Sequence, residues 1–178
     1  MTGSTYEVWV RALRAWGKDP TVSMDHLPAL DEESLPPAGF ERLMVHMGKA
    51  VQDFTEQWSS RLGARLGQAA DEFAQAQVLV DAKKMFARRL LLVTHPGLPH
   101  SLREALWEDS CAFVRSLQQR LEADGAEQDR KDFGSDGKHA AFYRRHSMLD
   151  LISPGFPLAD FAAGKYRDPI HSRGTADA

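Results

Sequence analysis

The chain has 178 residues, of which 43% are apolar and 26% are charged, and its formal net charge is −3 at pH 7. This composition is typical of a globular domain, and it excludes a disordered acidic chain, a collagen-like repeat and a disulfide scaffold. The single cysteine excludes an internal disulfide and any site built from several cysteines. Since the net charge is small, the molecule as a whole has no strong attraction for nucleic acid.

No segment reaches the roughly 18 consecutive apolar residues that a membrane span requires. The N-terminus has no basic stretch followed by an apolar segment, so we expect no signal peptide. We expect a cytoplasmic protein of bacterial type, because a lone thiol suits a reducing compartment.

The first helix is expected over residues 5–16. Ser4 and Glu7 form a capping-box pattern, and Trp9 and Trp16 lie on the apolar stripe that follows. Residues 18–37 are rich in proline and carry an acidic run. They predict a connector, because proline restricts the backbone and removes a hydrogen-bond donor.

A long apolar seam follows over residues 38–93, which contain no proline. Its residues recur at steps of three and four, as in a coiled coil: Phe40, Met44, Met47, Val51, Phe54, Trp58, Leu62, Leu66, Ala69 and Phe73. Gly63 and Gly67 are the weak point, because glycine is a poor helix former. We expect either one long bent helix or two helices divided near this pair. The small size of the two residues would equally suit a tight helix crossing at a dimer contact.

The next helix is expected over residues 101–124. Ser101 and Glu104 form a second capping-box pattern, Gly125 is a natural stop, and the short loop before the helix favours an antiparallel neighbour. The fold class is therefore all-α: a helical bundle or long helical hairpin with an extended C-terminal arm that carries short helices. We assign residues 1–125 to the bundle and 126–178 to the arm, docked on the bundle or on a partner chain.

The apolar content predicts protein contacts. The seam is longer than one neighbouring helix can cover, so we expect a homo-oligomer or a protein partner. The C-terminal arm is too apolar for a free tail and should also dock. The residues expected to contribute are Trp9, Trp16, Trp58, Gly63, Gly67, Phe142, Tyr143 and Phe156.

Two basic clusters are candidates for anion or nucleic-acid contact. They comprise Lys83, Lys84, Arg88 and Arg89 in the first, and Lys138, Arg144 and Arg145 among aromatic residues in the second. The alternative for the first cluster is a solvated helix end whose cations offset the helix dipole. The alternative for the second is an amphipathic segment that docks on the protein itself.

Catalytic patterns are missing from the sequence. The histidines lack helical metal-ligand spacing, no phosphate-binding loop or nucleophile elbow occurs, and Cys111 lies among apolar residues as a structural thiol. We therefore predict no catalytic residue, no metal and no cofactor. The expected function is that of a non-enzymatic helical interaction protein, such as an adaptor, scaffold or accessory subunit. The alternatives are a nucleic-acid-binding or regulatory protein that uses residues 83–89 and 138–146, and a small enzyme that uses His95, His100 or His146.

Overall fold

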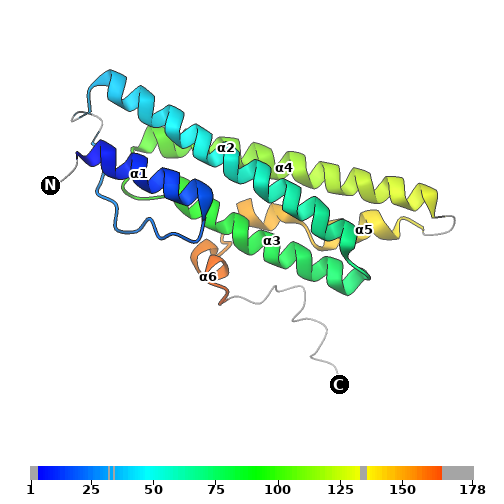
Figure 1. Cartoon of the computed structure of the whole chain (residues 1–178). Helices are drawn as coiled ribbons and strands as arrows, with labels where there is room; N and C mark the ends of the chain where they lie inside the picture. Colours follow the sequence, from blue (N-terminus) through cyan, green and yellow to red (C-terminus); the bar gives the residue numbers. More distant parts are fainter. Residues whose placement is uncertain (1–3, 32, 34, 133–135, 166–178) are drawn as a thin grey trace.

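Three long helices, each antiparallel to the next, form the body of the protein in a computed structural model that describes residues 4–31, 33, 35–132 and 136–165 (Figure 1). No strand occurs within these residues, so the predicted all-α helical bundle is confirmed. The helices in chain order are α1 (Thr5–Lys18), α2 (Pro37–Gln68), α3 (Glu72–Val93), α4 (His100–Lys131), α5 (Lys138–Arg145), the 3-10 helix η1 (Met148–Ile152) and α6 (Leu158–Ala162).

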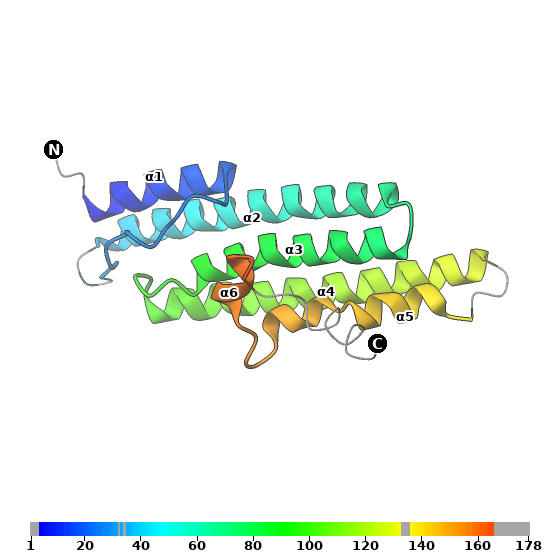
Figure 2. The ribbon, with the colours of Figure 1, turned by 90° about the horizontal axis from the view of Figure 1, so that it is seen from below.

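The shorter helices cover the flanks of this body. Helix α1 lies beside α2 and runs in the same direction, while α5 and η1 lie along α4 and α6 packs against α3 (Figures 1 and 2). The described part of the predicted arm therefore docks on the bundle of its own chain, which is one of the two arrangements that the sequence left open.

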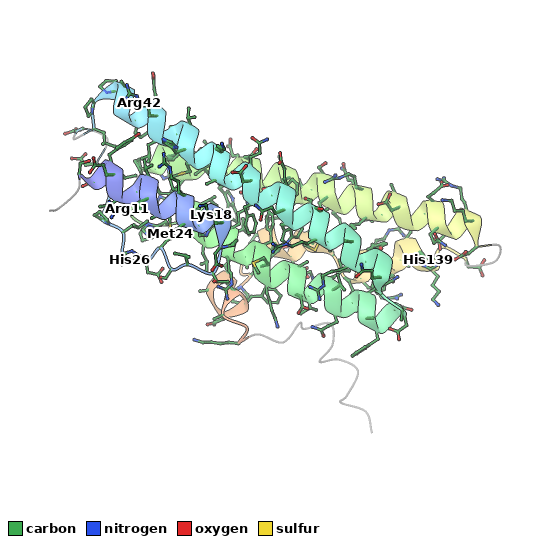
Figure 3. All side chains as sticks on the ribbon, in the orientation of Figure 1. Arg11, Lys18, Met24, His26, Arg42 and His139 are labelled. Carbon is green, nitrogen blue, oxygen red and sulfur yellow. The ribbon has the colours of Figure 1, made fainter. Side chains whose placement is uncertain are left out.

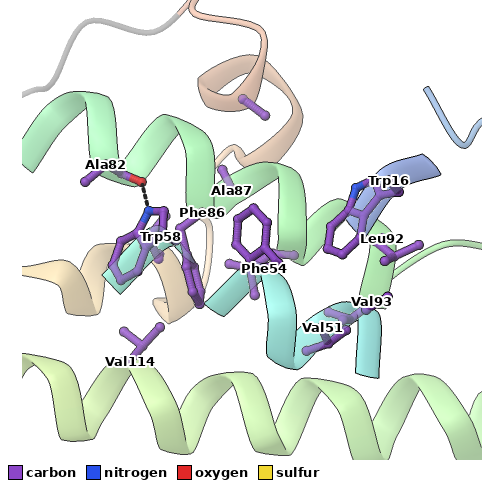
Figure 4. Packing of buried hydrophobic residues seen from close by; sticks show 14 of the residues in the cluster. Trp16, Val51, Phe54, Trp58, Ala82, Phe86, Ala87, Leu92, Val93 and Val114 are labelled. Atoms are coloured by element: carbon purple, nitrogen blue, oxygen red, sulfur yellow. Dashed lines mark hydrogen bonds between the residues drawn. The ribbon is translucent and has the colours of Figure 1, made fainter. Parts of the chain in front are cut away.

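Aromatic side chains fill the centre of the core. Trp16 stacks on Phe54 with ring centroids 5.2 Å apart, and Trp58 packs 4.9 Å from Phe86 (Figure 4). The indole Nε1 of Trp58 donates to the Ala82 carbonyl at 3.0 Å, which gives this buried donor a partner. These contacts join α1, α2 and α3 into one packed unit.

The connector between α1 and α2 is held against the bundle by polar contacts. The indole of Trp9 donates to the Pro28 carbonyl at 2.8 Å. The buried ring of His95 accepts from the Gly97 N–H at Nδ1, at 2.9 Å, so its proton resides on Nε2, which donates to the Met24 carbonyl at 2.8 Å. His95 is thus occupied by the backbone on both sides of its ring.

The long seam is divided into two helices, as one of the sequence alternatives proposed, but the division lies at residues 69–71 rather than at Gly63 and Gly67. The side chain of Asp71 accepts from the Ala74 N–H at 2.7 Å and caps α3. The two glycines lie within α2. The position at which one helix ends and the next begins is therefore set by the N-cap aspartate and not by the poor helix propensity of the glycines.

The expectation that the seam exceeds what the chain can cover is wrong for the described residues. Its central members are buried inside the protein, and they include Met47, Val51, Phe54, Trp58 and Leu62. Helices α1 and α3 both pack on α2, so the seam is covered by two neighbouring helices instead of the one expected. The large apolar side chains that remain exposed in the described part are scattered: Val22, Val45, Phe73, Leu91 and Leu149.

Helix α4 differs from the prediction at both ends. It begins at His100, after Pro99, without a side-chain cap hydrogen bond, so the second capping box is wrong. It continues through Gly125 to Lys131, and the boundary predicted after residue 125 falls inside the helix. A Cβ at Gly125 would lie 2.8 Å from the backbone nitrogen of Ala140. Gly125 is therefore the point where α5 approaches α4 closely, and not a helix stop.

Candidate functional site

The tryptophans expected at an interface lie in the core of their own chain. Trp9 and Trp16 are almost fully buried and Trp58 is 5% exposed. On the C-terminal side, Phe142 is buried in the core, Tyr143 is half-buried beside α4, and Phe156 is half-buried with its ring 5.0 Å from that of Phe161 in α6. Of these residues, only Tyr143 and Phe156 keep accessible surface of any size.

The first basic cluster is divided between the interior and the surface. Lys83 and Arg89 are each 1% exposed, with Lys83 Nζ 3.0 Å from the Asp150 carboxylate and Arg89 Nη2 3.3 Å from that of Asp109. Burial lowers the pKa of Arg89 to about 10, which leaves it charged at neutral pH. These two cations join α3 to η1 and α4. Lys84 and Arg88 remain half-buried at the surface.

Arg89 is also held by aromatic rings. Its guanidinium carbon lies 5.0 Å from the ring centroid of Phe86 and 5.8 Å from that of Phe113. This stacking supports a buried cation whose Nε and Nη1 atoms have no hydrogen-bond partner. Arg89 is therefore a core residue, and its charge is turned toward α4.

The second basic cluster is paired with carboxylates of the bundle. Lys138 and Arg145 both contact Glu72, at 3.9 and 2.6 Å, and Arg144 contacts Glu122 at 3.1 Å. Hydrogen bonds from Gln118 and then from Arg144 lower the pKa of the Glu122 carboxyl. The charges of α5 thus anchor this helix on α3 and α4.

Metal-binding and nucleophilic groups show no catalytic arrangement where the chain is described. Within those ranges, no three His, Cys, Asp or Glu side chains come together as a metal site would require. Burial raises the pKa of the Cys111 thiol, so the thiolate is disfavoured.

An apolar groove lies between α2 and α4, with a volume of about 250 Å³. Gly63 forms part of its wall, and a Cβ at Gly63 or Gly67 would meet no atom within 4 Å, so this stretch of α2 is open to an approaching molecule. Polar residues Ser59, Arg120 and Asp124 border the groove. Its apolar lining consists of Leu62, Leu66, Leu117, Leu121 and Tyr143.

This α2–α4 groove combines residues that the sequence singled out with residues that it did not. Gly63 and Tyr143 were predicted, whereas Leu117, Arg120 and Asp124 were not. Residues of α2 and α4 are brought together by the tertiary packing of these helices on α3 and on each other, so no local pattern marks the groove. The sequence signals were the glycine spacing and the apolar content of the C-terminal arm.

Comparisons with protein-family models, with curated proteins and with solved structures each found no match to this chain. In the described ranges, every helix is too short or too polar to cross a lipid bilayer.

Proposed function

We propose that this chain is a non-enzymatic helical interaction protein, and that its α2–α4 groove receives the same face of a second copy. The observation that carries the proposal is the open surface at Gly63 and Gly67 beside a row of leucines. Glycines on a helix surface let another backbone approach closely, and the half-buried Leu66 and Tyr143 supply apolar area for such a contact above Leu62, Leu117 and Leu121, which the fold already buries.

The charges on the rim suit a second copy. Arg120 and Asp124 are exposed, lie one helical turn apart on α4, and form no ion pair in the described structure. A twofold axis across the groove sets two α4 helices antiparallel, so that Arg120 of each copy faces Asp124 of the other. Such a contact is self-complementary, as an interface between identical chains requires.

The alternative of a nucleic-acid-binding protein that uses residues 83–89 and 138–146 has weaker support. Five of its seven predicted cations are in ion pairs with carboxylates of the same chain: Lys83, Arg89, Lys138, Arg144 and Arg145. The alternative of a small enzyme is weakened at His95, because both nitrogens of its ring are hydrogen-bonded to backbone groups. A cytoplasmic location remains part of the proposal.

Light scattering after size-exclusion chromatography tests the proposal over a concentration range of about 1 to 100 µM. The chain is expected to form a dimer, and the variant Gly63→Leu/Gly67→Leu is expected to be a monomer because leucine side chains fill the groove. Both substitutions replace an exposed helical glycine, so they should stabilise the fold by roughly 0.5–1 kcal/mol each.

Gly48→Leu is the matched control. Gly48 also lies in α2 with no atom within 4 Å of a Cβ, and it is about 22 Å along the helix from Gly63. This variant should gain stability and remain a dimer. A wild-type monomer at the highest concentration, or a dimer that survives the double substitution, would contradict the proposal.

A further inference from the structure

A third set of basic residues lies on α1 and α2, and its charges are not neutralised by ion pairs within the described part of the chain. On α1 they recur at steps of three and four, and on α2 at steps of four and three, so each set lies along one side of its helix. Among the described residues, none of their side chains has an ion pair or a hydrogen bond. The set, called here the α1–α2 basic face, is Arg11, Arg14, Lys18, Arg42, His46 and Lys49.

The parallel packing of α1 and α2 brings these residues together. The helices touch where a Cβ at Gly17 would lie 3.7 Å from Ala50. Beside this contact is a groove of about 360 Å³, lined on one side by Arg14 and Lys18 and on the other by His46 and Lys49. Arg42 extends the same side of α2 toward its N-terminus, and in Figure 3 Arg11, Lys18 and Arg42 can be found on these two helices.

Negative charge at this groove is sparse. Asp53 is the carboxylate among the residues that line it. Glu7, on α1, accepts from the backbone N–H of Ser4 in the capping box and so is engaged locally. Five permanent cations and one histidine therefore share a surface where like charges repel, and an anion bound there would relieve that repulsion.

A second hollow, of about 640 Å³, continues this surface at the N-terminal ends of both helices. Arg42 lines it together with Tyr6, which is half-buried. Because α1 and α2 are parallel, the positive ends of both helix dipoles lie at this hollow and add to the field of the cations. The first turn of α2 has no side-chain cap, since its N-cap residue is Pro36.

We infer that the α1–α2 basic face binds a linear polymer of phosphate groups, the chemistry shared by a nucleic-acid backbone and inorganic polyphosphate. The cations form two rows, each about 10 Å long at 1.5 Å per residue, and so they match successive charges along a polymer. A single phosphate would instead need donors that converge on one point, and these side chains are spread along the helices. Tyr6 offers a ring on which a base can stack, at the end of the row that begins with Arg42.

The salt dependence of binding tests this inference. Fluorescence anisotropy with labelled single-stranded RNA and DNA, and with labelled polyphosphate, is measured on the full chain between about 50 and 200 mM salt. Five phosphate contacts predict a slope of log K against log salt of about −3.5, which is an affinity loss of about 100-fold over that range. Arg14→Gln/Lys18→Gln/Arg42→Gln/Lys49→Gln should reduce the size of the slope by about 2.8.

The matched control removes cations that are already paired. Lys138→Gln/Arg144→Gln/Arg145→Gln should leave the slope unchanged, because Glu72 and Glu122 hold those charges. Tyr6→Leu separates the two sources of phosphate: a loss of about tenfold for RNA or DNA, with none for polyphosphate, identifies a nucleic acid. If Tyr6→Leu leaves the affinity for both ligands unchanged, the result identifies polyphosphate.

Several results would overturn the inference. One is that no phosphate polymer binds at the lowest salt. Another is that the control variant loses as much binding as the four-residue variant, and a third is that the four-residue variant has the same salt slope as the wild type. Tighter binding of poly-glutamate or of anionic phospholipid vesicles than of phosphate polymers would also overturn it, because the surface would then serve an acidic peptide or a membrane. The four substituted residues are exposed, so circular dichroism should show an unchanged fold.

Discussion

The ion-paired basic residues of α3 and α5 and the residues of the α1–α2 basic face have opposite surroundings. On α3 and α5, the ammonium of Lys83 and the guanidinium of Arg145 each meet a carboxylate of the same chain, at 3.0 and 2.6 Å. On α1 and α2, Arg14, Lys18 and Lys49 line a groove with no such partner in the described structure. Basic residues thus hold the fold together in one region and leave charge for a ligand in the other.

The difference shows why local basic charge is a poor guide to function. An ion pair within the chain neutralises a cation, and an anionic ligand then gains little from approaching it. A cation with no partner keeps its full attraction for such a ligand. Whether a basic cluster binds depends on the carboxylates that the fold brings to it, and three substitutions test the region of α3 and α5 in these terms.

The largest effect is expected from Gly125→Val, which forces α5 and its cations away from α4. The new Cβ would lie 2.8 Å from the backbone of Ala140, and neither helix backbone can yield locally. We expect the free energy of unfolding in urea to fall by about 3 kcal/mol. Gly63→Ala, where the added Cβ meets open space, should raise it by about 0.5–1 kcal/mol. Equal effects of the two substitutions would refute the close approach.

A smaller loss is expected from Asp150→Ala, which takes one carboxylate from the buried ammonium of Lys83. Removal of one member of a buried pair usually costs 3–5 kcal/mol, and the 39% exposure of Asp150 reduces our expectation to about 2 kcal/mol. Replacing both residues, as Lys83→Met/Asp150→Leu, should recover most of this loss. A change below about 0.5 kcal/mol in the single variant would mean that the pair does not hold η1 on α3.

Glu72→Gln should convert a paired cluster into an unpaired one. Lys138 and Arg145 lose their common carboxylate, and the first turn of α3 loses a negative charge, so stability should fall by about 1 kcal/mol. The same variant gains two free cations, and its salt slope for single-stranded nucleic acid should become steeper by about 1.4. An unchanged slope would show that pairing does not decide which cations bind.

The helices follow from local sequence, whereas the pairing of charges does not. Apolar periodicity predicted α1, and the contacts between Ser4 and Glu7 confirm its capping box. The division between α2 and α3 lies at residues 69–71 and not near Gly63 and Gly67, because the Asp71 cap outweighs the poor helix propensity of the two glycines.

The partners of the basic clusters were beyond the reach of any local pattern. Asp150 is 67 residues from Lys83, and Glu72 is 73 residues from Arg145. The α1–α2 basic face was missed for a related reason. Its two rows come from different helices, and within each row the basic residues are three or four positions apart, so the sequence shows no continuous basic run.

The free energy of unfolding at low ionic strength tests the contrast most directly, with two charges removed from each region. Arg14→Gln/Lys49→Gln should raise it by about 0.3 kcal/mol because repulsion is relieved, and Arg144→Gln/Arg145→Gln should lower it by about 1 kcal/mol because ion pairs are lost. Both changes should shrink at about 1 M salt, where charges are screened within about 3 Å. Changes of the same sign in the two variants would contradict the account.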